Sequence, residues 1–250
     1  ALSNCLNNQS ALETKKYQIA VENAVNNKSI SDSTGVKDDK VWIFHGSKDE
    51  TVSQQVVQSQ SNLYQSLGAK VTEVFTVPSG HGVPTTDQGV TCESTKSPFI
   101  NACMFDSAGA YLNTLFGNLN PKVTDLKNRG KMVAFNQADF LAEGESNTLA
   151  EEGFYYLPKN CSSGAECRIH VAFHGCQQNY ETIEKQFIQQ NGLNEWAESN
   201  NIVVIYPQTT ASFVPLNPKA CWDWWGYTGK DYQTRNGKQL KHVFQMVMGL

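Results

Sequence analysis

Apolar and polar positions change along this chain in short blocks, which predict strands and helices that follow one another. The expected strands are residues 41–44, 71–77, 132–135, 154–157, 168–174 and 202–206. The expected helices are residues 10–26, 51–67, 106–116, 180–200 and 236–248. Strands that alternate with helices are typical of the α/β class, here with a mostly parallel sheet covered by helices on both faces.

Polar residues and glycines indicate where several of these elements begin and end. Ser10 and Glu13 have the spacing of a capping box for the first helix. Thr51 is in position to cap the second helix, and Gly68 ends it. Gly192 predicts a break within residues 180–200, and the aromatic stretch 207–235 is expected to be a long loop.

Candidate chemistry collects where three predicted strands end. Asp49 follows Phe44 by five residues, and His81 follows Val77 by four. The apolar run 168–174 ends in His174-Gly-Cys176. Functional groups of parallel sheets gather at the carboxyl ends of their strands, so we expect these three strand ends to carry the site.

An Asp and a His at successive strand ends match the acid–base half of a Ser-His-Asp triad. The carboxylate of Asp49 would hold one imidazole tautomer of His81, and His81 would take and return the proton of the nucleophile. Each residue also has a plain structural interpretation. Asp49 can cap the helix that begins beside it, and His81 can be a loop histidine without a role.

The residues around Cys176 allow several interpretations. Its backbone N–H can stabilise an oxyanion, while its thiolate could act as a nucleophile or its sulfur could bond Cys221. The disulfide is favoured, because Cys221 precedes an aromatic cluster that needs an anchor. The three tryptophans of that cluster can pack a core or loop, and one of them can line an apolar cleft; they are Trp222, Trp224 and Trp225.

Composition limits the class of protein. The 250 residues fit one large domain, 1–250, and 40% hydrophobic with 18% charged residues is ordinary for a globular chain. A net charge of −4 without a Lys/Arg stripe argues against nucleic acid or an anionic membrane as partner. No apolar run has the length of a membrane span. No cofactor or metal is expected, because no Cys-x2-Cys spacing occurs.

Seven cysteines suggest an oxidising compartment, and therefore a secreted or periplasmic protein. Two local pairs flanked by small and polar residues read as loop disulfides, and Cys176 with Cys221 would form a long-range pair. The local pairs are Cys92 with Cys103 and Cys161 with Cys167. Cys5 is then left over.

The sequence contains no nucleophile elbow. A Gly-x-Ser-x-Gly pentapeptide between a strand and a helix is absent. Ser107, in Asp106-Ser-Ala-Gly109, is the nearest imitation, but it lacks the first glycine and follows a cysteine loop.

Several segments together resemble the extracellular polyhydroxybutyrate depolymerases, in particular their circularly permuted single-domain type. The resemblance covers most of residues 40–230. The segments are His45-Gly-Ser-Lys-Asp-Glu-Thr-Val52, Gly80-His-Gly-Val-Pro-Thr-Thr-Asp87, His174-Gly-Cys-Gln177, Asn191-Gly-Leu-Asn-Glu-Trp-Ala197, Tyr206-Pro-Gln208 and Cys221-Trp-Asp-Trp224.

The resemblance implies an α/β-hydrolase fold, circularly permuted, and an esterase that cleaves 3-hydroxybutyrate polymer. It makes Asp49 the triad acid and His81 the base, gives the oxyanion N–H to Cys176 within a bridge to Cys221, and places Trp224 at the substrate. The two local cysteine pairs also match bridges of the family. The family's elbow serine, and a cysteine that bonds near Cys5, would lie on a segment before Ala1.

We therefore expect a serine esterase whose nucleophile lies upstream of residue 1, so that this chain is a hydrolase domain incomplete at its N-terminus. The segment would be an N-terminal fragment of the same precursor, linked through Cys5, and the substrate a polyester or short ester. The alternative is a non-catalytic polymer- or surface-binding protein that keeps a degenerate hydrolase fold.

Overall fold

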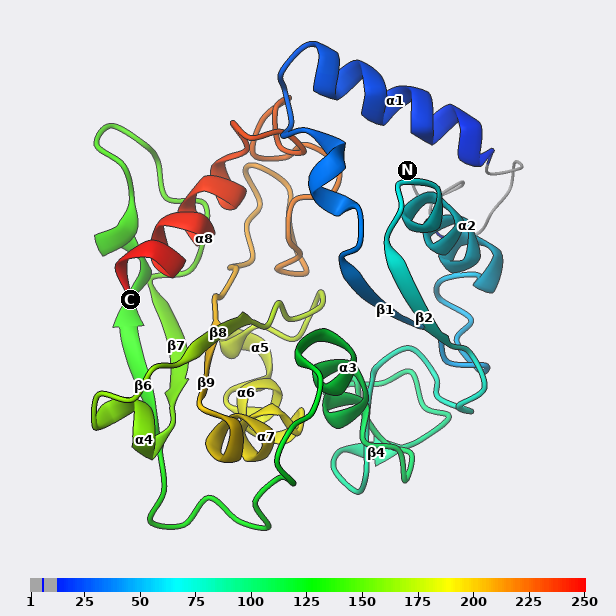
Figure 1. Cartoon of the computed structure of the whole chain (residues 1–250). Helices are drawn as coiled ribbons and strands as arrows, with labels where there is room; N and C mark the ends of the chain where they lie inside the picture. The colour runs from blue at the N-terminus through cyan, green and yellow to red at the C-terminus, as the bar shows by residue number, and fades with distance from the viewer. Residues whose placement is uncertain (1–5, 7–12) are drawn as a thin grey trace. The chain divides into compact units, whose positions relative to one another are not determined.

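The structure is a computed structural model that describes Leu6 and residues 13–250 (Figure 1). Ser10 and Cys5 lie outside the described residues, so the capping box and the pairing of that cysteine stay predictions. The chain divides into two compact units, residues 1–118 and 119–250. The single domain of residues 1–250 stays a prediction too.

In its described residues, Leu6 and 13–118, the first unit contains two small parallel sheets with three α-helices. Strands β1 and β2 pair with each other, and β3 and β4 both pair with β5. The elements are α1 (Thr14–Asn26), a 3-10 turn η2 (Ser33–Val36), β1 (Lys40–Phe44), α2 (Gln54–Ser66), β2 (Lys70–Val74), β3 (Val83–Thr85), β4 (Val90–Thr91), β5 (Ile100–Ala102) and α3 (Ser107–Phe116).

Helices α2 and α3 lie on opposite faces of the β1–β2 pair. Successive side chains of a strand point to opposite faces. Trp42 of β1 packs its ring 5.7 Å from that of Tyr111 in α3. On the other face, Gln58 of α2 donates to the carboxylate of Glu73, the register partner of the buried Ile43. The pattern Val41-Trp-Ile-Phe44 is apolar throughout because both faces are covered.

The second unit contains one four-stranded sheet in the order β6-β7-β9-β8. Strand β7 is antiparallel to both β6 and β9, whereas β8 and β9 are parallel. The elements are β6 (Lys131–Asn136), a 3-10 turn η3 (Gln137–Phe140), β7 (Glu152–Leu157), α4 (Lys159–Ser162), β8 (Arg168–Val171), α5 (Tyr180–Ile183), α6 (Gln186–Gln190), α7 (Leu193–Asn200), β9 (Ile202–Tyr206) and α8 (Lys238–Gly249).

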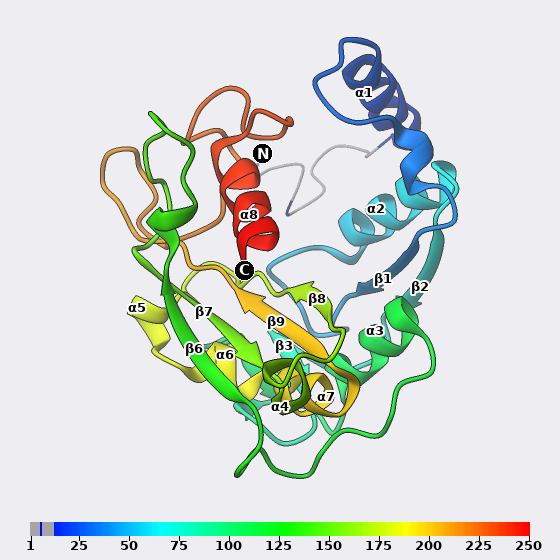
Figure 2. The same cartoon turned by 60° about the vertical axis from the view of Figure 1, so that its left-hand side comes forward.

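Helices cover this sheet on both faces as well (Figure 2). On one face, Tyr206 donates to Asn194 of α7, and its ring lies 6.2 Å from that of Phe187 in α6. On the other face, Val243 and Met246 of α8 form an apolar cluster with partners that include Phe135 and Val171. The central strand β9 is buried accordingly, with Ile202, Val204, Ile205 and Tyr206 fully covered.

The α/β class and the mostly parallel pairing are confirmed, since four of the six strand pairs between described residues are parallel. The strand expected at 168–174 ends at Val171 and is only half-buried, because β8 is the edge of its sheet. The strand expected at 71–77 likewise ends at Val74.

Some helix boundaries and short strands differ from the sequence prediction. Helix α2 is preceded at its N-cap position by Ser53 and not by Thr51, while Gly68 follows its end with a φ of +89°. The helix expected at 180–200 is three short helices, interrupted at Glu184 and Gly192, whose φ values are also positive. Strands β3, β4 and β5 were not predicted, because a strand of two or three residues is too short to show an alternation of apolar and polar residues.

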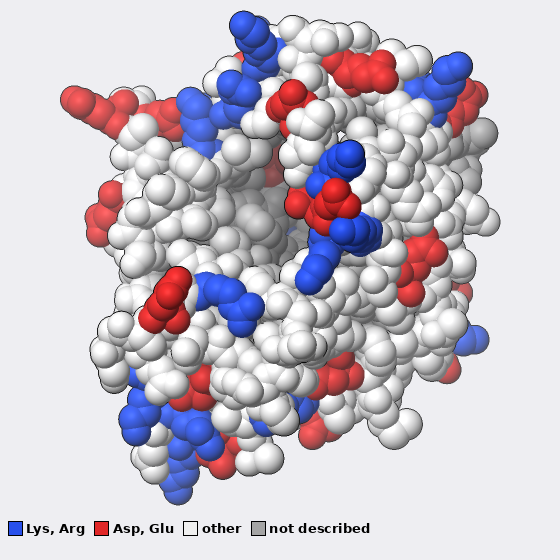
Figure 3. Space-filling view, viewed as in Figure 1, with Lys and Arg blue, Asp and Glu red and all other residues white. Residues whose placement is uncertain are grey.

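Charged side chains of both signs are interspersed on the face seen in Figure 3, although Lys and Arg gather at its lower left. This distribution agrees with the absence of a Lys/Arg stripe in the sequence. Within Leu6 and residues 13–250, none of the helices combines the length and the apolar character that crossing a membrane requires.

Candidate active site

Asp49 and His81 meet through their side chains in the first unit. Asp49 Oδ2 lies 2.8 Å from His81 Nδ1. The Asp49 side chain is 10% exposed and that of His81 is 43% exposed. No hydrogen bond to His81 Nε2 is formed within the described part of the chain. The ring is therefore held at one nitrogen and accessible at the other, as a general base requires.

The two loops that carry this pair are joined by their backbones. Ser47 N–H donates to Val77 O at 2.8 Å, and Lys48 N–H donates to Ser79 O at 3.1 Å. At Gly46 a Cβ atom would lie 2.1 Å from Ser79 O, so only glycine permits this close passage. The loops leave the carboxyl ends of the paired strands β1 and β2 side by side, which brings the two side chains within reach.

Asp49 serves two purposes at once. Its Oδ1 accepts from the N–H groups of Thr51 and Val52 at 2.8 and 3.1 Å, which shapes the turn before α2. Burial by itself would raise the pKa of Asp49, but the hydrogen bond and charge of His81 and the two backbone donors outweigh it, so the pKa is lowered. One carboxylate oxygen of Asp49 thus contacts His81, and the other shapes the turn before α2 without capping the helix itself, whose N-cap position is Ser53. The role of Asp49 as a triad acid stays a prediction.

The side chain of His45, for which the sequence predicted no partner, is hydrogen-bonded within the Asp49 loop. It is 5% exposed, and its Nε2 lies 2.9 Å from Val52 O. Because a carbonyl only accepts, Nε2 carries the proton. His45 thus fixes the same residue whose N–H Asp49 binds.

The backbone N–H of Cys176 lies in the second unit, where the neighbouring N–H groups are all engaged. Gly175 N–H donates to Gln178 Oε1 at 2.8 Å, Gln177 N–H to Lys219 O at 2.7 Å, and Gln178 N–H to Gly175 O at 3.2 Å. Within Leu6 and residues 13–250, the N–H of Cys176 has no protein acceptor. It is therefore available to a substrate oxygen, as an oxyanion donor must be.

His174 ties this turn to a distant loop. Thr209 N–H donates to its Nε2 at 3.2 Å, so its Nδ1 carries the proton and donates to Gly175 O at 2.7 Å. Burial lowers the pKa of His174 to about 4, against the opposing effect of the Gly175 carbonyl. The ring is neutral in the folded protein and serves to hold the loop.

Acid should therefore weaken the protein through His174. An unfolded histidine titrates near 6.5 and the folded one near 4, so the unfolded state binds more protons between these values, and stability falls as pH drops through that window. Between pH 7 and pH 4.5 we expect the wild type to lose about 2 kcal/mol more unfolding free energy than His174→Gln. Urea unfolding at both pH values measures this, and equal losses would contradict it.

All three expected disulfides are present. They join Cys92 to Cys103, Cys161 to Cys167, and Cys176 to Cys221. Because Cys176 Sγ is bonded to Cys221, it is not a thiolate, and the cysteine-nucleophile interpretation fails for this state. Ser107 is no nucleophile either, since it is 3% exposed and its hydroxyl donates to Pro84 O.

Trp224 and Trp225 lie on an ordered loop with half-exposed rings, 5.3 Å apart at their centroids. Asp223, which was not among the residues predicted from the sequence, organises this loop. Its carboxylate accepts from four backbone N–H groups and one hydroxyl between Trp225 and Thr228. Burial would raise the pKa of Asp223, but these donors outweigh it and lower the pKa. A carboxylate followed by Gly226 and Thr228 is a turn signal that could have revealed it.

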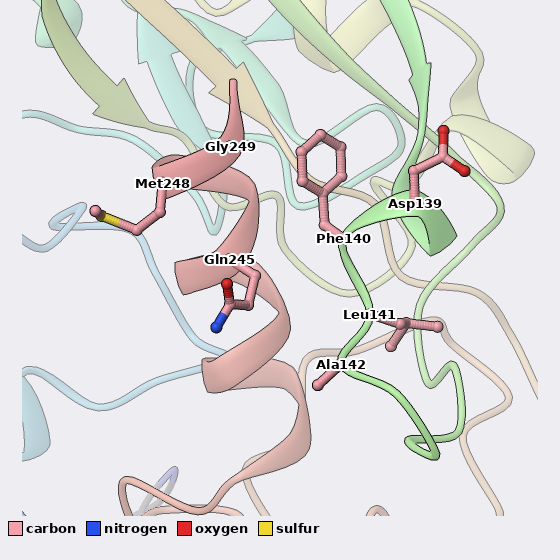
Figure 4. A pocket seen from close by; sticks show the side chains of 7 residues that line it. All are labelled: Asp139, Phe140, Leu141, Ala142, Gln245, Met248 and Gly249. Atoms are coloured by element: carbon pink, nitrogen blue, oxygen red, sulfur yellow. The ribbon is translucent and has the colours of Figure 1, made fainter.

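A pocket of about 310 Å³ lies elsewhere, between the end of α8 and residues 139–142 (Figure 4). Phe140, Gln245 and Met248 line it, together with four other residues. None of the candidate residues contributes to it, so the pocket does not bear on their chemistry.

Comparisons with known proteins give a consistent picture, although no family model matches the sequence. A poly(3-hydroxybutyrate) depolymerase of Delftia acidovorans is 34% identical over 216 residues, which are 85% of this chain and 42% of that protein. A polyhydroxybutyrate depolymerase of Talaromyces funiculosus is 34% identical over 226 residues, 83% of this chain and 65% of that protein. The chain thus spans less than two thirds of the length of these curated relatives.

Two solved structures are similar over nearly the whole chain at 29% identity. The crystal structure of PHB depolymerase from Penicillium funiculosum has a TM-score of 0.88 and is matched over 97% of this chain and 80% of its own. A PHB depolymerase with a serine replaced by alanine, complexed with an R3HB trimer, has a TM-score of 0.91 and is matched over 99% and 81%. The mixed sheets and their covering helices are thus an α/β-hydrolase-like fold, and over most of its length the chain is similar in sequence and in structure to polyhydroxybutyrate depolymerases.

Proposed function

We propose that the protein is a serine esterase that hydrolyses poly(3-hydroxybutyrate), or a related short hydroxyalkanoate ester, through an acyl-enzyme. The observation that carries the proposal is the 2.8 Å contact between His81 Nδ1 and Asp49 Oδ2, in a chain that is similar to polyhydroxybutyrate depolymerases. The curated relatives are named as depolymerases of polyhydroxybutyrate, which supports this polyester as the substrate class. The R3HB trimer bound to one similar solved structure supports it further.

In the proposed reaction, His81 Nε2 takes the proton of a serine hydroxyl as its oxygen attacks the ester carbonyl carbon. Asp49 keeps Nδ1 protonated and stabilises the imidazolium that forms. The Cys176 N–H stabilises the oxyanion, an interaction worth about 3 to 4 kcal/mol in comparable sites. Collapse of the intermediate expels the alcohol, which receives the proton from His81. Water then repeats the sequence on the acyl-serine.

The serine belongs, in this proposal, to a segment that precedes Ala1. Two observations support this: the sequence contains no Gly-x-Ser-x-Gly, and Ser107 is buried and hydrogen-bonded. The order Asp49, His81, Cys176 fits the permuted arrangement, in which the elbow comes before the acid. Trp224, half-exposed on its Asp223-organised loop, is proposed to contact the substrate. The three disulfides favour a secreted or periplasmic location.

The test is activity of the protein that carries both this chain and the serine segment. His81→Ala should lower kcat on a 3-hydroxybutyrate trimer by about 10³-fold or more, because the nucleophile loses its general base. Asp87→Asn, an exposed change six residues further on, should leave kcat unchanged. Wild-type rates in His81→Ala would refute the assignment.

A second candidate, a polymer-binding protein without catalysis, is favoured by one feature of the second unit. The tip of the 212–217 loop exposes Phe213 by 88% and Val214 by 92%, while backbone hydrogen bonds between Ser212 and Asn217 hold its base. A fixed apolar tip suits adsorption to an apolar polyester surface. Adsorption of the wild type to polymer film without release of any 3-hydroxybutyrate would favour this candidate over the esterase.

A further inference from the structure

Asn101, on the three-residue strand β5, lies at the centre of the hydrogen bonds around the His81 loop. Its side chain is fully buried. The amide nitrogen lies 2.9 Å from both Cys92 O and Ser94 O, 3.1 Å from Ser79 Oγ and 3.5 Å from Gly80 O. One amide thus contacts both the segment that precedes His81 and a second segment, residues 92–94.

Residues 92–95 hold the backbone of the His81 loop at two points. Gly80 N–H donates to Cys92 O at 2.9 Å, and His81 N–H donates to Thr95 Oγ1 at 2.9 Å. Asn101 therefore binds the carbonyl of Cys92, which also accepts from Gly80, and the carbonyl of Ser94, which directly precedes the Thr95 that accepts from His81. The position of the imidazole depends on this double attachment.

Close packing explains the Gly-His-Gly sequence at this place. A Cβ at Gly80 would lie 2.5 Å from Ser94 O, and one at Gly82 would lie 2.7 Å from Asn101 Oδ1. A side chain at Gly80 would push the loop away from the backbone of residues 93 and 94, and one at Gly82 would push it away from Asn101. His81 is therefore the one residue with a side chain between two positions, 80 and 82, at which close packing requires glycine.

We propose that Asn101 is a positioning residue for His81, which orients the loop so that Nδ1 faces Asp49 Oδ2 and Nε2 remains accessible. This inference rests on the proposed function, in which His81 is the general base. Asn101 touches neither the imidazole nor a substrate; it acts through the carbonyls of residues 80, 92 and 94. A displacement of catalytic groups by about 1 Å can cost about 10²-fold in rate.

The test compares Asn101→Ala with Asn194→Ala. Asn194 is equally buried, and its side chain donates to Ile188 O and accepts from Tyr206 in the second unit. Both changes remove a buried amide, so both should lower the melting temperature. Only Asn101→Ala should lower kcat about 10- to 100-fold with KM within about twofold. It should also abolish the low-field proton resonance of the Asp49-bound His81 Nδ1–H, which Asn194→Ala should keep.

Thr95→Val keeps the inference testable if Asn101→Ala does not fold. Thr95 is exposed, so its loss is tolerated, yet it removes the acceptor of the His81 N–H. We expect a smaller decrease in kcat, about 3- to 10-fold, and a broadened Nδ1–H resonance. Unchanged kcat and resonance in Asn101→Ala, or in Thr95→Val where the former is unfolded, would overturn the inference. So would an equal decrease in kcat for Asn194→Ala.

The two proposals can fail separately. If the wild type and all variants lack esterase activity, the proposed function fails, while the His81 resonance still shows whether Asn101 holds the ring. If His81→Ala abolishes activity and Asn101→Ala has no effect on either measurement, only the positioning role is refuted.

Discussion

Asp49→Asn is expected to lower kcat on a short 3-hydroxybutyrate ester by about 10⁴-fold, in the protein that carries the serine segment. The amide would place an N–H donor against His81 Nδ1, where the carboxylate now accepts at 2.8 Å. The imidazole would then carry its proton on Nε2, and it could no longer accept the proton of the serine. The wrong tautomer, and not a lost fold, causes the defect.

Two features of the structure make this variant informative. The asparagine keeps an Oδ1 for the N–H groups of Thr51 and Val52, so the turn before α2 should persist and the melting temperature should change little. Glu50→Gln removes the same charge from the adjacent, exposed position and should keep wild-type kcat. An undiminished rate in Asp49→Asn, or the same decrease in Glu50→Gln, would leave Asp49 only its role in the turn.

The meeting of Asp49 and His81 was predictable because it follows from strand order. Strands β1 and β2 are parallel neighbours with Phe44 opposite Val74, so their loops emerge at one edge. Each strand has an apolar pattern long enough to be recognised in the sequence. The candidate chemistry at the strand ends could then be inferred from the residue types alone, a carboxylate and an imidazole.

The supports of this pair were not predictable in the same way. Asn101 lies 20 positions from His81 on a strand of three residues, inside a disulfide loop, where no period is readable. His45 faces its own loop and binds Val52 O, a contact that depends on the backbone path and not on the sequence pattern. Such contacts arise from tertiary packing, which local propensity does not encode.

His174 shows the opposite case, a residue that stands out in the sequence for a structural reason. It ends a predicted strand beside Gly175 and Cys176, yet its ring is buried and binds Thr209, 35 residues later. The candidate donor of the turn is the neighbouring backbone N–H of Cys176. What holds that N–H in place is therefore the attachment of the turn to residues 209–221.

The Cys176–Cys221 disulfide is the covalent part of this attachment. Its removal should lower both the stability of the protein and kcat. It closes a loop with a sequence separation of 45, so the double change Cys176→Ser with Cys221→Ser should cost about 4 kcal/mol of unfolding free energy. The backbone N–H at 176 survives the change. We nevertheless expect kcat to decrease about 10- to 100-fold, because a donor that moves stabilises the oxyanion poorly.

The Cys161–Cys167 disulfide provides the matched control, because it closes a loop with a separation of only 6 and contacts none of the candidate residues. Cys161→Ser with Cys167→Ser should cost about 2 kcal/mol and leave kcat unchanged. Urea unfolding and ester hydrolysis measured on both double variants separate tethering from stability. If both lower kcat in proportion to their loss of stability, the Cys176–Cys221 disulfide only stabilises the fold. The proposed oxyanion donor would then be held by hydrogen bonds such as that from Gln177 N–H to Lys219 O.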